Sequence, residues 1–165
     1  MVNAMIFAGG TGTRMKTSDI PKQFIEVDGK PIIIRTLENF STHPEVDGIV
    51  ISCLEAWIDE LWKLIEKWKI AKVVVKGGST GHESIHNGLV RVDEFTKPED
   101  IVLICDGVRP VMSEQLISNC IKLAREYETA VPVTPSIDSV LWSDDGEHCS
   151  KALPRGSMYI TQAPQ

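Results

Sequence analysis

The sequence has no run of roughly 18 apolar residues, the length that a helix needs to cross a bilayer. Its apolar start, residues 1–7, has neither a basic flank nor a small-residue cleavage site, and it leads directly into a glycine-rich segment. We therefore predict a first β-strand there rather than a signal peptide. A cytoplasmic protein with no membrane partner is the expectation.

An excess of positive charge is also absent. The chain has 17 Lys and Arg against 23 Asp and Glu, which gives a formal net charge of −6. Non-specific nucleic-acid binding needs basic surface that releases counterions. We expect no nucleic-acid partner, although a local basic pocket for phosphate groups remains compatible with this balance.

The four cysteines form no CxxC pair, so a structural zinc site is not expected. Cys53 and Cys105 lie in apolar runs that are typical of strands, and we predict that they are buried free thiols. Free thiols favour a reducing compartment.

No internal repeat or linker interrupts the chain, and apolar segments alternate between strand-like and helix-like spacing. Ser113 is expected to cap one of the helices. The alternation predicts an α/β three-layer sandwich with a mostly parallel sheet. The predicted strands cover residues 2–8, 48–53, 72–76, 101–105 and 129–134, and the predicted helices cover residues 31–42, 55–69, 83–95 and 114–127. Residues 140–142, before an Asp-Asp-Gly turn, are predicted to form half of a hairpin.

Loops at the carboxyl ends of parallel strands meet at one edge of the sheet and line the ligand crevice. We therefore expect four segments to lie together: residues 9–14, 77–84, 106–110 and the stretch after Thr134.

The glycine-rich segment Ala8-Gly-Gly-Thr-Gly-Thr-Arg14-Met, followed by Pro21-Lys-Gln, carries the strongest chemical signal. Glycines let the backbone approach a phosphate chain and point N–H groups at it. Arg14 and Lys22 add positive charge to the same anion. The third glycine of a dinucleotide-binding GxGxxG loop and the Gly-Lys-Ser/Thr of a Walker A loop are both missing. The alternative is a tight strand-to-helix turn.

AGGTGTRM…PKQF…GKPIIIRTLE resembles the opening of the CTP-dependent cytidylyltransferases that act on methylerythritol phosphate and ribitol 5-phosphate. Further segments match in order: Gly77-Gly78 with Ser84, Asp106-Gly-Val-Arg-Pro110, and Arg155 with Ala163-Pro-Gln165. The resemblance implies a Rossmann-like nucleotidyltransferase fold and transfer of CMP from CTP with release of pyrophosphate.

The same resemblance implies roles for individual residues. Arg14 and Lys22 would neutralise charge on the α-phosphate, and Asp106 would hold Mg²⁺, which is expected as the divalent cation. Asp138, Ser139 and Arg155 would face the second substrate, and Arg155 would also serve catalysis, often from a partner subunit. The residues expected to contact the nucleotide are Ala8, Gly9, Gly10, Thr11, Gly12, Gly77, Ser84, Asp106 and Gly107. An Asp at a strand end can alternatively be a helix cap.

Three departures from the family pattern stand out. Ser79 and Gly81 replace the acidic and arginine residues of the base-binding loop, Ala163 replaces the threonine of TPQ, and the family's later segments are missing. The expectation is a single nucleotidyltransferase domain over residues 1–165, C-terminally incomplete, with a dimerisation arm near residues 138–157 and a homodimeric assembly.

The AGGTGTRM segment and the helix that carries Trp57 resemble the ribitol-phosphate branch of the family more closely. This resemblance implies D-ribitol 5-phosphate as acceptor, which would give CDP-ribitol. Methylerythritol phosphate, the acceptor in isoprenoid precursor synthesis, stays open as an alternative. A non-catalytic nucleotide-binding fragment is the alternative from a different class of protein.

Overall fold

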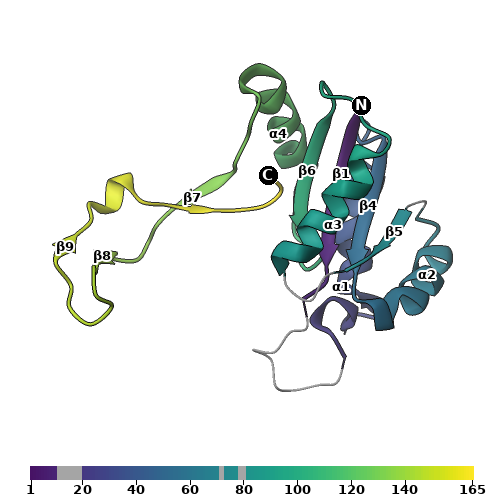
Figure 1. The fold of residues 1–165 in the computed structure, drawn as a ribbon, viewed down its shortest axis with the longest axis horizontal. Helices are drawn as coiled ribbons and strands as arrows, with labels where there is room; N and C mark the ends of the chain where they lie inside the picture. Colours follow the sequence, from purple (N-terminus) through teal and green to yellow (C-terminus); the bar gives the residue numbers. More distant parts are fainter. Residues whose placement is uncertain (11–19, 71–72, 78–80) are drawn as a thin grey trace.

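The computed structural model describes residues 1–10, 20–70, 73–77 and 81–165. Four parallel strands form the central sheet in the order β5-β4-β1-β6 (Figure 1). Their bounds are β1 Val2–Ala8, β4 Gly48–Cys53, β5 Val73–Lys76 and β6 Ile101–Asp106. Apolar, β-branched runs suit such strands because parallel strands are covered on both faces.

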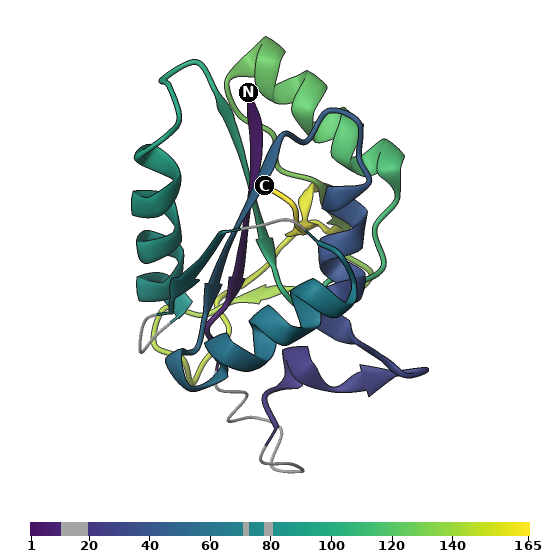
Figure 2. The same cartoon turned by 90° about the vertical axis from the view of Figure 1, so that its right-hand side faces the viewer.

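Helices cover both faces of this sheet, which confirms the predicted three-layer α/β sandwich (Figure 2). One face carries α3 (Gly81–Asp93), and its cluster is built around Met5, Val50 and Val92. The opposite face carries the larger core under α1, α2 and α4, whose bounds are Ile32–Ser41, Ile58–Lys67 and Glu114–Tyr127.

Side chains along β1 alternate between the two cores. Ala4, Ile6 and Ala8 belong to the larger core, whereas Met5 points to the α3 side. Because successive side chains of a strand point to opposite faces, β1 contributes buried side chains to both layers. Its neighbours hold it in register, with Ala4 opposite Ile49 on β4 and Leu103 on β6.

Short elements complete the body of the fold. Strands β2 (Glu26–Val27) and β3 (Lys30–Pro31) pair as a hairpin, and its turn residues Asp28 and Gly29 have φ of 50° and 68°. Two positive φ values are what a tight two-residue hairpin needs, and an Asp-Gly pair supplies them. The predicted helix over residues 55–69 is a single-turn η2 (Glu55–Trp57) followed by α2.

The prediction of a fifth strand over residues 129–134 in the main sheet was wrong. Residues 133–135 form β7 (Val133–Pro135), which pairs antiparallel with β10 (Tyr159–Thr161) outside that sheet. Proline has no N–H for a ladder bond. Pro132 directly precedes β7, and Pro135 is its last residue. At β6 the pairing partner is instead Gln165, which exchanges two backbone hydrogen bonds of 2.7 and 2.9 Å with Ile104.

From β7 through β10 the chain forms an arm that extends away from the sheet (Figure 1). It contains the hairpin β8 (Leu141–Trp142) and β9 (Lys151–Ala152), which confirms the predicted hairpin, and then η3 (Arg155–Ser157). Apolar side chains are exposed along it, including Ile137, Leu141, Trp142, Tyr159 and Ile160.

The predicted buried thiols are confirmed for Cys53 and Cys105, which are free and have no exposed surface. Burial removes water from the thiolate form, and this raises the pKa of each thiol to about 12. Cys149, on the arm, is free and exposed.

Ser113 provides a direct test of local structure. Its hydroxyl accepts from the N–H of Leu116 at 3.2 Å and begins α4 as predicted. We expect Ser113→Ala to lower the free energy of unfolding by about 1 kcal/mol because the Leu116 N–H loses its side-chain acceptor and keeps only the Ser113 carbonyl, at 3.1 Å. Ser113→Asp should keep most of the stability, and urea denaturation measures both. Equal stability of Ser113→Ala and wild type would contradict the assignment of the cap.

Candidate active site

The carboxyl end of β1 meets the start of α3 at Gly9. A Cβ on Gly9 would overlap the Ser84 hydroxyl and lie 2.9 Å from Ser84 Cβ, so only glycine fits. Ser84 is fully buried on the first turn of α3. The predicted nucleotide contacts Gly9 and Ser84 are therefore brought together by the fold.

Gly77, at the end of β5, closes the same corner. Its N–H donates to the carbonyl of Cys53 at the end of β4, and a Cβ there would lie 2.5 Å from that oxygen. The Gly77 Cα lies 3.8 Å from where a Cβ of Gly9 would stand. Three strand ends thus approach so closely that backbone, rather than side chains, forms the surface.

On the other side of β1, Asp106 is the last residue of β6 and Gly107 follows it. The N–H of Gly107 donates to the carbonyl of Phe7 at 3.0 Å, and the Thr36 hydroxyl donates to the Gly107 carbonyl at 3.2 Å. A Cβ on Gly107 would lie 3.2 Å from Ala8 Cβ. Two of the predicted nucleotide contacts, Ala8 and Gly107, are therefore neighbours.

Arg109 braces the loop that carries Asp106. Its Nε donates to Asp106 Oδ2 at 3.1 Å, and its Nη1 donates to Gln162 Oε1 at 3.2 Å. One carboxylate oxygen of Asp106 is engaged by the guanidinium, and the side chain remains 31% exposed.

Asp106 fits the expected role of a magnesium ligand by its chemistry. Mg²⁺ with nucleotides is usually held by one or two carboxylates together with phosphate oxygens. Within the described ranges, no three His, Cys, Asp or Glu side chains gather as a self-sufficient metal site. A partly exposed carboxylate at the end of β6 suits this shared mode of binding.

The sequence assigned no role to Gln23, but the structure places it against two of the predicted nucleotide contacts. Its buried Nε2 donates to the carbonyls of Ala8 at 2.6 Å and Gly10 at 3.4 Å. Gln23 belongs to the single turn η1 (Lys22–Phe24), so these bonds fix the turn against the end of β1. Lys22, the preceding residue, is exposed. In the sequence, the short spacing between the glycine segment and Pro-Lys-Gln was the signal that could have indicated this contact.

Not every predicted site residue can be placed. Thr11, Gly12 and Arg14 lie outside the described residues. Gly10 is described, and a Cβ on it would meet no heavy atom of the described residues within 4 Å.

The residues expected to face the second substrate lie on the arm. Arg155 Nη2 donates to the Ser139 hydroxyl at 3.0 Å, and the neighbouring Asp138 carbonyl accepts from the Ser136 hydroxyl at 3.1 Å. Because the arm extends away from the sheet (Figure 1), the expectation that the stretch after Thr134 lines the same crevice was wrong for most of its length. Only the base of the arm lies at this edge of the sheet, where the side chain of Gln162 forms hydrogen bonds with both Arg109 and Thr134.

The fold and the site together define an α/β nucleotidyltransferase. A protein-family model described as IspD, 2-C-methyl-D-erythritol 4-phosphate cytidylyltransferase, matches residues 2–165. The chain belongs to this family of cytidylyltransferases.

Similar proteins agree with this assignment. A ribitol-5-phosphate cytidylyltransferase of Vibrio parahaemolyticus is 42% identical over 98% of this chain and 69% of its own length. Its counterpart in Streptococcus agalactiae serotype III is 39% identical over 98% of this chain and 68% of its own length. The crystal structure of 4-diphosphocytidyl-2C-methyl-D-erythritolsynthase from Anaerococcus prevotii superposes with a TM-score of 0.81 at 30% identity, covering 99% of this chain and 67% of the other.

In the part of the chain that the structure describes, no helix has the length and apolar character that crossing a membrane requires.

The close approach at Gly9 gives a prediction with an internal control. We expect Gly9→Ala to lower the free energy of unfolding by about 1–3 kcal/mol, since the added methyl group forces Ser84 and β1 apart. Gly10→Ala, where a methyl group meets no neighbour among the described residues, should leave the free energy of unfolding unchanged within error. Thermal and urea denaturation of both variants checks this, and equal effects at the two positions would refute the close packing.

Proposed function

We propose that this protein transfers CMP from CTP to D-ribitol 5-phosphate, forming CDP-ribitol and pyrophosphate. The observation that carries the proposal is the 42% identity, over 98% of this chain, to a relative named ribitol-5-phosphate cytidylyltransferase. The geometry supports the nucleotide half of the reaction, because glycine backbone and one carboxylate meet at the strand ends.

In this reaction an acceptor phosphate oxygen attacks the α-phosphorus of CTP. A new P–O bond forms there while the bond from the α-phosphorus to the β-phosphate oxygen breaks, and pyrophosphate leaves. Such a step needs alignment of two anions and stabilisation of growing charge, rather than a protein nucleophile.

We assign these tasks to the chain's own residues. The backbone at Gly9 and Gly10 would lie against the triphosphate, and Ser84 and Gly77 would shape the pocket for the nucleoside. Lys22, on a turn that Gln23 fixes to β1, would place its ammonium group on the α-phosphate. Arg14 is proposed to act on the same phosphate. Asp106 would hold Mg²⁺, which when bound screens the negative charge of the phosphates.

Methylerythritol phosphate is the second candidate acceptor. It is favoured by the description of the matching family model and by the superposed structure from Anaerococcus prevotii. The two acceptors differ in the polyol that the arm residues would contact, so a parallel assay separates them.

We further propose a homodimer in which the arm reaches the partner's nucleotide site. Arg155 and Ser139 lie on an arm directed away from the sheet (Figure 1). The exposed side chains of Trp142 and Tyr159 give this arm an apolar surface. Large exposed apolar patches commonly mark interfaces. The arm corresponds to the dimerisation segment proposed over residues 138–157 of the single domain.

Free buried thiols support a cytoplasmic location.

The reaction is tested by coupled pyrophosphate release with CTP, Mg²⁺ and each acceptor in parallel. We expect turnover with ribitol 5-phosphate, and a loss on the order of 10²–10³ in rate for Lys22→Ala, since one charge-stabilising donor is removed. Turnover with methylerythritol phosphate alone would overturn the acceptor, and an unimpaired Lys22→Ala would overturn the mechanism.

The dimer is tested by mixing two inactive variants, Lys22→Ala and Arg155→Ala. If Arg155 acts on the partner's site, each mixed dimer has one intact site, and random pairing restores about a quarter of the wild-type rate. If Arg155 acts within its own chain, the mixture stays as inactive as either variant alone, and the proposal fails.

A further inference from the structure

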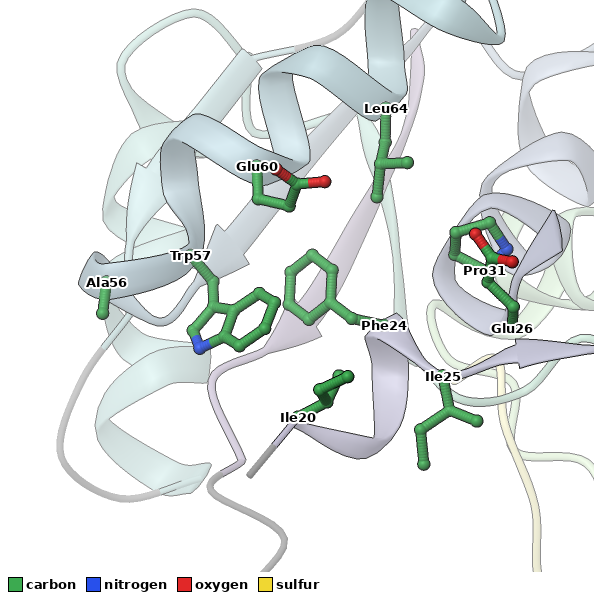
Figure 3. Close-up of a pocket in the computed structure, with 9 residues that line it drawn as sticks. All are labelled: Ile20, Phe24, Ile25, Glu26, Pro31, Ala56, Trp57, Glu60 and Leu64. Carbon is green, nitrogen blue, oxygen red and sulfur yellow. The ribbon is translucent and has the colours of Figure 1, made fainter. Parts of the chain in front are cut away.

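A cavity lies between the turns η1 and η2 and helix α2 (Figure 3). Its volume is about 750 Å³, within the range of small-molecule sites in proteins. Apolar side chains dominate its lining, which includes Ile20, Phe24, Ile25, Trp57 and Leu64. None of these residues belongs to the nucleotide site described above.

An aromatic pair forms one wall of the cavity. The rings of Phe24 and Trp57 stack with centroids 4.7 Å apart and an interplanar angle of 29°. Phe24 is 7% exposed and anchored in the core, whereas Trp57 is half-buried and presents part of its indole to the cavity. Flat aromatic surface of this kind attracts apolar groups and cations.

Among the described residues that line the cavity, the two charged ones are both acidic. Glu60, from α2, and Glu26, from β2, lie on different sides of the cavity, with Phe24 and Leu64 between them (Figure 3). Glu60 is also 3.3 Å from the ammonium of Lys63, whose side chain is 73% exposed and free to turn into solvent. An apolar cavity edged by carboxylates complements a molecule with an apolar body and a positive charge.

We propose that this cavity binds a small organic cation, an amine with an aromatic or alkyl body. The apolar body lies against Phe24, Trp57 and Leu64, and the negative charge of Glu60 and Glu26 at the two sides of the cavity favours a ligand that carries an ammonium group. The ligand is a small molecule rather than a peptide because the volume matches one compact body. The site does not depend on the proposed reaction, although Phe24 shares a turn with Lys22.

Three probes with one common ring test the proposal: phenethylamine, phenethyl alcohol and phenylacetate. Each is titrated into the full chain while the indole N–H resonance of Trp57, assigned with Trp57→Phe, is followed by NMR. Because exposed carboxylates each contribute modestly, we expect the amine to bind about five-fold more tightly than the alcohol, and phenylacetate most weakly.

Substitutions then locate the charge effect. Glu26→Gln with Glu60→Gln should reduce the amine's affinity to that of the alcohol and leave the alcohol's affinity unchanged. The matched control combines Asp59→Asn with Glu66→Gln and removes two exposed carboxylates of α2 that do not line the cavity. It should change neither the amine's affinity nor the alcohol's. Equal binding of amine and alcohol, an equal loss in the control, or an unmoved Trp57 resonance would overturn the proposal.

Discussion

Strand β1 is the constraint on which the rest of the molecule depends. It lies between β4 and β6 in parallel register, and its buried side chains alternate between the two cores. Its carboxyl end is then held by three different contacts: Gln23 on the carbonyls of Ala8 and Gly10, Gly107 on the carbonyl of Phe7, and Ser84 against Gly9. Any shift of β1 along the sheet would break all three together. The packing that stabilises the fold therefore also positions the glycine backbone that we propose receives the nucleotide.

The two proposed substrates are served by parts of the chain with different physical character. The nucleotide side is backbone-rich and buried, and it lies on the ends of packed strands, where position is fixed by neighbours on both faces. The acceptor side is an arm with short two-residue strands and exposed apolar side chains. Arg109 links the two, since it contacts Asp106 beside the sheet and Gln162 at the root of the arm. A homodimer would give the arm the packed surroundings that it does not have within one chain.

Sequence reasoning worked where the signal was local. Periodicity placed β1, β4 and β6 to within a residue, and the Ser113 hydroxyl marked the start of α4. It failed where the partner was distant: β-branched residues before Pro135 suggested a strand of the main sheet, but a strand's partner is decided elsewhere in the chain, here at β10. The Asp28-Gly29 hairpin had a local signal that went unused. In the proposed site, the motifs predicted the glycines and Asp106, whereas the contact of Gln23 requires knowing that η1 folds back on β1.

Hydrogen–deuterium exchange with and without CTP and Mg²⁺ tests the central claim most directly, which is that the nucleotide binds where β1 ends. The account predicts new protection at the backbone of residues 8–10, 77, 84 and 106–107, with none along the β8–β9 hairpin at protein concentrations that do not change the oligomeric state. Protection confined to the cavity beside Trp57, or to the arm, with the end of β1 unaffected would contradict it.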